Sequence, residues 1–173
     1  GSSPVIAGTG FMVGRDIMMT NRHVAELFAD GIGVDNPAVK SGHSAFVDFR
    51  RELSKKQDRA AHHQVRPLLL HPHWDMALLE VDGLAGGIEP VVLDSSADFP
   101  EAGRKIALIG HPVISHGGTT EQMKALVGKA GGFKHLSPGE TMALNQISYD
   151  GFDSTTVFTH DCGSLGGNSG SPV

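Results

Sequence analysis

The sequence predicts an all-β fold, a barrel or a sandwich, on three observations. Many short segments are rich in apolar or β-branched residues, and polar or glycine-rich turns separate them. No long segment repeats its apolar residues with the 3.6-residue period of a helix. Glycine occurs 23 times in 173 residues, about twice its usual frequency of about 7%, which suits a chain with many tight turns.

The predicted elements follow in chain order. The strands of the first half are expected at 5–13, 16–20, 44–49, 65–71 and 76–81. Those of the second half are expected at 91–93, 105–110, 123–128, 141–148 and 156–159. The best helical segment is 23–29, which the cap-type residues Thr20 and Asn21 precede. The glycine-rich segment 82–87 is typical of a connection between the two halves of the chain, so we expect one domain at 1–84 and another at 85–173.

Composition excludes several classes of protein. The single cysteine, Cys162, cannot form an internal disulfide or a Cys-x-x-Cys zinc site. The net charge of −5 without a concentrated basic patch argues against a nucleic-acid partner. No run approaches the roughly 20 apolar residues of a membrane-spanning helix, so no membrane span is expected.

Three local patterns carry residues suited to catalysis. His23 comes just after a predicted strand, at the start of the predicted helix. Asp75 stands at the beginning of the apolar run 76–81, where a carboxylate would be partly buried and would need a donor. Ser169 lies in a glycine-rich run that permits a sharp turn. Each pattern alone has an ordinary structural explanation, but together they supply a nucleophile, a base and an acid that orients the base.

Five motifs in this order resemble the trypsin-like serine proteases of the chymotrypsin fold. The branch they resemble is bacterial and disulfide-free, and is similar to glutamyl endopeptidases and HtrA-like proteases. The motifs are Gly-Thr-Gly-Phe at 8–11, Thr-Asn-Arg-His-Val at 20–24, Asp-Met-Ala-Leu-Leu at 75–79, Gly-His-Pro at 110–112 and Gly-Gly-Asn-Ser-Gly-Ser-Pro-Val at 166–173. The order His, Asp, Ser matches this family and differs from that of subtilisins and α/β-hydrolases.

The resemblance implies a fold, an activity and a set of site residues. The fold would be two six-stranded antiparallel Greek-key barrels, with the last strands of the second barrel outside this sequence. The activity would be that of a serine endopeptidase on a polypeptide substrate, through an acyl-enzyme. His23 would be the general base, Asp75 its orienting carboxylate and Ser169 the nucleophile, and the backbone N–H groups of Gly167 and Ser169 would form the oxyanion hole.

Two departures from the digestive enzymes bear on activation and specificity. Asn168 replaces the aspartate that pairs with a new N-terminus in those enzymes, so activation by that ion pair is not expected. Gly163 stands where trypsin has an acidic residue at the base of its specificity pocket, so a Lys or Arg preference is not supported. Gly163 and Ser164 are nevertheless the candidates for the specificity pocket.

Other chemistries fit less well. Cys162 lies seven residues before Ser169, outside the position of a cysteine nucleophile in viral relatives. The pairs His71/His73 and His62/His63 lack a recognised zinc spacing, and no metal or cofactor is expected. An esterase would place its histidine last in the chain order, which this sequence does not do.

One alternative stays open: an inactive or incomplete protease-fold module that binds peptides. The missing strands of the second barrel are a further possible partner, as a separate chain or as a segment outside this sequence. We expect a cytoplasmic protein, with secretion as the alternative.

Overall fold

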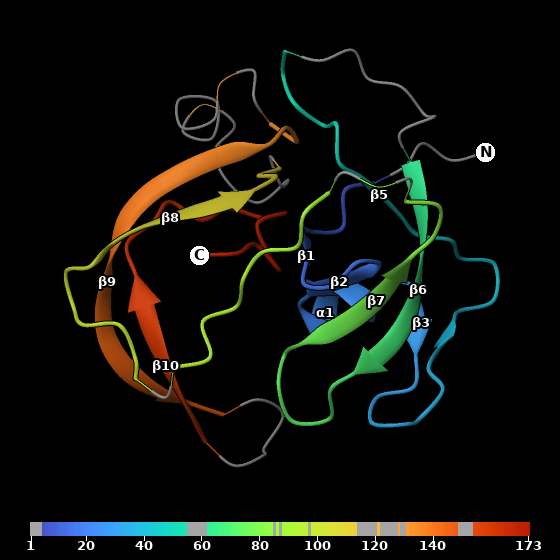
Figure 1. Ribbon diagram of the computed structural model, residues 1–173, viewed down its shortest axis with the longest axis horizontal. Helices are drawn as coiled ribbons and strands as arrows, with labels where there is room; N and C mark the ends of the chain where they lie inside the picture. The colour runs from blue at the N-terminus through green and yellow to red at the C-terminus, as the bar shows by residue number, and fades with distance from the viewer. Residues whose placement is uncertain are drawn as a thin grey trace.

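A computed structural model gives the fold, and it describes residues 5–54, 62–84, 86, 88–96, 98–113, 121, 128, 131–148 and 154–173. Its larger sheet has five antiparallel strands, in the order β1 (Phe11–Met12), β2 (Ile17–Thr20), β7 (Ala77–Val81), β6 (His62–Leu70) and β5 (Phe46–Asp48). Figure 1 shows this sheet on the right. It carries the segments that hold His23 and Asp75.

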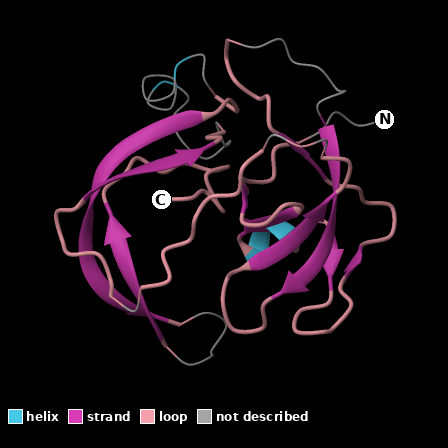
Figure 2. Ribbon diagram, in the orientation of Figure 1, coloured by secondary structure: helices cyan, strands magenta, loops and turns pink. Residues whose placement is uncertain are grey.

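A second sheet has three antiparallel strands, in the order β10 (Thr155–His160), β9 (His135–Ile147) and β8 (Lys105–Gly110). In Figure 1 it curves on the left, and the C-terminal segment lies between the two sheets. Helix α1 (Arg22–Ala25) follows β2, and a small hairpin joins β3 (Ala29–Asp30) to β4 (Ala38–Val39). Figure 2 shows how little of the described chain is helical.

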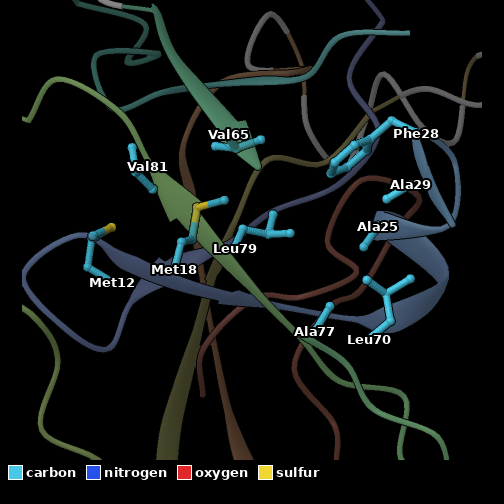
Figure 3. Close-up of a cluster of buried hydrophobic side chains, with 10 residues drawn as sticks. All are labelled: Met12, Met18, Ala25, Phe28, Ala29, Val65, Leu70, Ala77, Leu79 and Val81. Carbon is cyan, nitrogen blue, oxygen red and sulfur yellow. The ribbon is translucent and has the colours of Figure 1, made fainter. Parts of the chain in front are cut away.

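The main hydrophobic core fills the concave face of the five-stranded sheet. Its buried members are Met12, Met18, Ala25, Phe28, Ala29, Val65, Leu70, Ala77, Leu79 and Val81. Figure 3 shows Leu79 among these side chains, close to Met18, which is its register partner on β2. Burying a side chain of this size contributes about 1.5–3 kcal/mol relative to leaving it exposed. The core therefore fixes β7 against β2, and with it the two segments that carry His23 and Asp75.

Most of the predicted strands are present. The segment 105–110 is β8, and 16–20, 44–49, 65–71, 76–81 and 156–159 fall on β2, β5, β6, β7 and β10. The segment 141–148 falls on β9, which begins earlier, at His135. Of the predicted segment 123–128, residues 123–127 lie outside the described residues.

Three predictions are corrected. The segment 91–93 is not a strand: Val92 is 97% exposed, and the backbone N–H of Val91 bonds to Met12 O without starting a ladder. Of the predicted strand 5–13, only β1 is a strand, because the preceding residues turn toward Ser169.

The helix predicted at 23–29 is also shorter than expected. It occupies Arg22–Ala25, since Lys40 binds the carbonyl oxygens of Glu26 and Phe28 and draws the chain into the β3–β4 hairpin.

Candidate active site

The pairing of β2 with β7 brings His23 and Asp75 together. The strands are antiparallel, with Thr20 opposite Ala77, so the end of β2 and the start of β7 lie at the same edge of the sheet. His23 follows β2 by three residues, and Asp75 precedes β7 by two. The sheet register alone therefore places the two side chains close to each other.

Asp75 binds His23 through both carboxylate oxygens. Oδ1 accepts the backbone N–H of His23 at 2.9 Å, and Oδ2 lies 2.7 Å from the ring Nδ1. The carboxylate is mostly buried, with 15% of the side chain exposed, whereas the imidazole is 54% exposed. Because an ionised carboxylate only accepts hydrogen bonds, Nδ1 donates to it, and Nε2 of the neutral ring keeps its lone pair for a proton.

The neighbours of Asp75 hold it in this position. Asn21 Nδ2 donates to the backbone carbonyl of Asp75 at 2.9 Å, and it makes no capping bond to helix α1, although the sequence predicted a capping role. Buried Arg22 donates to the carbonyl oxygens of His71 and Pro72 at 3.1 and 2.9 Å. The loop that ends in Asp75 is thus tied to the segment that carries His23.

Ser169 lies in a tight loop whose backbone carbonyls are held one after another. Val113 N–H donates to Gly166 O at 2.7 Å, and Ser171 N–H donates to Asn168 O at 2.9 Å. Gly167 and Gly170 have φ angles of +85° and +84°, which favour glycine over other residues. Among the described residues, no backbone hydrogen bond uses the N–H of Gly167 or of Ser169, and Gly167 itself is buried.

A cavity of about 400 Å³ joins Asp75 and Ser169 in one lining. Ser164 and His160 line it as well, whereas Gly163 is exposed and lies outside the lining. Within the described part of the chain, no hydrogen bond joins Ser169 Oγ to His23. The structure therefore pairs His23 with Asp75 directly and places Ser169 with Asp75, but not with His23, in the lining of this cavity.

His111, in the Gly-His-Pro segment, lies next to Gly167 in the loop that carries Ser169. Burial lowers the pKa of His111 below its usual value, and the charges of Lys134 and Arg51 act in the same direction, whereas Asp48 opposes them. His111 Nε2 is buried without a hydrogen-bond partner among the described residues. The neutral imidazole is the form that this environment favours.

The described residues show neither a metal cluster nor a membrane helix. No three or more His, Cys, Asp or Glu side chains gather there in a way that could hold a metal ion. No helix in that part of the chain is long and apolar enough to cross a membrane. Cys162 is buried as a free thiol.

Residues 8–173 match the sequence family of trypsin-like peptidase domains. The chain belongs to the trypsin-like peptidase family. The match begins at the Gly-Thr-Gly-Phe motif and extends to the last residue, so it covers both sheets and the loop that carries Ser169. No curated protein matches the sequence.

Solved structures of trypsin-like proteases share the fold. The inactive form of the Rv3671c protease of M. tuberculosis H37Rv aligns with a TM-score of 0.56 and 21% identity, over 95% of this chain and 64% of that one. Deg5 aligns with a TM-score of 0.56 and 19% identity, over 98% of this chain and 70% of that one. This trypsin-like peptidase spans less than two thirds of the Rv3671c chains. The predicted all-β, chymotrypsin-like fold class is confirmed.

Proposed function

We propose that this trypsin-like peptidase is a serine endopeptidase that works through an acyl-enzyme. The double contact of Asp75 with His23 carries the proposal, because it orients the ring and stabilises the imidazolium that forms when the ring takes a proton. The shared cavity supports it further, since a peptide bond placed there would meet Ser169 beside the same carboxylate. The substrate would be a polypeptide.

The chemistry assigns one role to each group. Ser169 Oγ attacks the scissile carbonyl carbon while His23 Nε2 takes the hydroxyl proton, and the carbonyl oxygen becomes an oxyanion. The N–H groups of Gly167 and Ser169 donate to that oxygen. The C–N bond then breaks, and His23 gives its proton to the leaving amine. Water, deprotonated by His23, then attacks the acyl carbon, and the bond from that carbon to Ser169 Oγ breaks as His23 returns the proton to Oγ.

The specificity pocket would lie in the cavity beside Ser169. Ser164 lines this cavity and is the candidate that we retain for contact with the substrate side chain, whereas Gly163 lies outside the lining and is the weaker candidate. Asn168 is only 5% exposed, and as an amide it offers no charge to a new N-terminus. Activity would therefore not depend on that ion pair.

A digest of a proteome-derived peptide library tests the activity and reads out the specificity. The wild-type protein should cleave internal peptide bonds, and the Ser169→Ala variant should cleave none above background. Cleavage of equal extent by both proteins would contradict the proposal, because the activity would then not use Ser169.

A second candidate is a peptide-binding module without turnover. The observation that favours it is the lack of a hydrogen bond between Ser169 and His23 in the described structure. A peptide would then add a strand to an open sheet edge. Wild type and Ser169→Ala would bind library peptides equally well and cleave none of them.

A further inference from the structure

The Gly-Thr-Gly-Phe segment crosses from the five-stranded sheet to the loop that carries Ser169. Thr9 is its central side chain and is 6% exposed. Its backbone N–H donates to Ser169 O at 2.8 Å, and its hydroxyl donates to Gly167 O, also at 2.8 Å. The same hydroxyl oxygen accepts the backbone N–H of His111 at 3.0 Å. One residue thus binds two carbonyls of the oxyanion loop.

The direction of the Gly167 N–H depends on the two peptide units that flank Gly167. The N–H shares a planar peptide unit with Gly166 O, which Val113 N–H holds at 2.7 Å. The next unit ends in Gly167 O, which the Thr9 hydroxyl holds. Gly167 at φ +85° is the joint between these two units, and a glycine joint rotates easily. The N–H of the unit that contains Gly167 O, on Asn168, donates to Leu165 O at 3.1 Å. Without the Thr9 hydroxyl, this side of the joint would therefore keep only one of its two hydrogen bonds.

We propose that Thr9 is a positioning residue that aims the oxyanion-hole N–H of Gly167. This inference rests on the proposed function, since it concerns the same reaction. Thr9 is itself anchored, because Thr20 Oγ1 donates to Thr9 O at 2.7 Å. The five-stranded sheet, which carries His23, thereby sets the geometry of the loop that carries Ser169. Thr9 acts on the oxyanion through Gly167 and does not touch it.

A hydroxyl is the group that this position requires. It donates to Gly167 O and accepts from His111 N–H at the same time, which valine, of nearly the same shape, cannot do. Serine keeps the hydroxyl and loses only the methyl group. Thr9→Val and Thr9→Ser therefore separate hydrogen bonding from packing.

Thr141 offers a matched control. It is 1% exposed, accepts the backbone N–H of Arg104 at 3.0 Å and donates to the carbonyl of Glu101, so its hydroxyl makes the same pair of bonds. Those bonds join the turn before β8 to β9 and none reaches the oxyanion loop. Thr141→Val should cost stability as Thr9→Val does, without misaligning Gly167.

The experiment measures kcat and KM on one cleaved peptide for the wild type, Ser169→Ala and the three threonine variants, with a melting temperature for each. We expect Thr9→Val to lower kcat by about 5- to 150-fold, the range that the loss of a buried hydrogen-bond partner implies. KM should change by less than about threefold. Thr9→Ser should recover most of kcat, and Thr141→Val should keep wild-type kcat.

The outcomes separate this inference from the proposed function. If the wild type is no more active than Ser169→Ala, the proposed function fails and this inference fails with it. If the wild type is active, the positioning role alone is wrong in either of two cases. In the first, Thr9→Val keeps the wild-type kcat, whether or not its KM rises. In the second, Thr9→Val loses no more kcat than Thr141→Val does. Thr9→Ala is added as a second variant without the hydroxyl. If Thr9→Val and Thr9→Ala both fail to fold while Thr141→Val folds, Thr9 is a structural residue and the inference is again overturned.

Discussion

Asp75 makes two contacts with His23, and one substitution can separate them. In Asp75→Asn, the amide oxygen can still accept the backbone N–H of His23, but the amide nitrogen then faces the ring Nδ1. Nδ1 must accept a hydrogen bond in that arrangement, which leaves the ring proton on Nε2, where the base needs a lone pair. We expect kcat at neutral pH to fall by about 10⁴-fold, measured on a peptide substrate.

Asp82→Asn is the control for this change. Asp82 lies in the same part of the chain and pairs with Arg66 on the exposed surface, at 2.9 Å. An exposed pair of this kind contributes only about 0–1 kcal/mol to stability. Its loss should leave kcat unchanged, and an Asp75→Asn variant within tenfold of wild-type kcat would show that Asp75 does not orient the base.

Gly167 has no space for a side chain. A Cβ there would overlap His111 O and approach Val113 to 3.1 Å, and the φ of +85° is strained for any residue with a Cβ. We expect Gly167→Ala to abolish measurable turnover and to destabilise the fold by about 1–3 kcal/mol or more, as shown by denaturant unfolding. Gly86→Ala, where nothing lies within 4 Å, should have neither effect. Full activity in Gly167→Ala would contradict the oxyanion assignment.

His111 should make the stability depend on pH. Burial holds its folded-state pKa below the usual value of 6.5, with Lys134 and Arg51 acting in the same direction. As the pH falls below about 6.5, the unfolded chain binds more protons at this site than the folded chain, so the free energy of unfolding decreases.

Between pH 7.5 and pH 5, the melting temperature of the wild type should therefore fall further than that of His111→Gln. An equal loss in both proteins would show that His111 is not held neutral by the fold.

Of the residues that the sequence proposed for the site, the structure joins His23 and Asp75 directly, and the long-range contacts around them were not predicted. His23, Asp75 and Ser169 each lie in a short motif, and the order of those motifs indicated their roles. Thr9 lies in such a motif too, but its bond to Gly167 joins residues 158 positions apart, and no local pattern shows which atoms meet over that distance. That His160 lines the cavity beside Ser169 was not predicted, for the same reason.

At the scale of elements, segments of strand-forming residues between turns predicted most of the strands. β7 alternates between buried and half-buried residues, and β8 was predicted with its observed bounds. β3 and β4 have two residues each, too few to show a period. The segment 91–93 has strand-forming residues, but among the described residues its backbone bond to β1 does not continue into a ladder, so its composition gave the wrong prediction.

Leu79 tests the contribution of the β2–β7 core. It is 2% exposed at the centre of the buried cluster, so Leu79→Ala should lower the free energy of unfolding by about 2–5 kcal/mol. Leu68→Ala, on the neighbouring strand β6 with 41% of the residue exposed, should cost much less. Urea unfolding of both variants measures the difference, and equal losses would mean that the cluster is not the main core.

At the scale of the whole molecule, the C-terminal segment that carries Ser169 connects the segment before β1 to β8. Thr9 N–H binds Ser169 O on one side, and Ile109 N–H of β8 binds Pro172 O on the other, at 3.2 Å. The fold class was predictable because the motifs occur in the family's order along the whole chain. The contacts between the sheets were not, because they join backbone atoms far apart in sequence.

The reactivity of Ser169 tests the central claim most directly. A fluorophosphonate probe reacts with a serine that a neighbouring base activates, and intact-mass analysis with peptide mapping counts and locates the adduct. We predict one adduct per chain, on the peptide that contains Ser169, with none in Ser169→Ala and strongly slowed labelling in His23→Ala. No adduct on the folded wild type, or an adduct on another residue, would contradict the assignment of this trypsin-like peptidase as a serine endopeptidase.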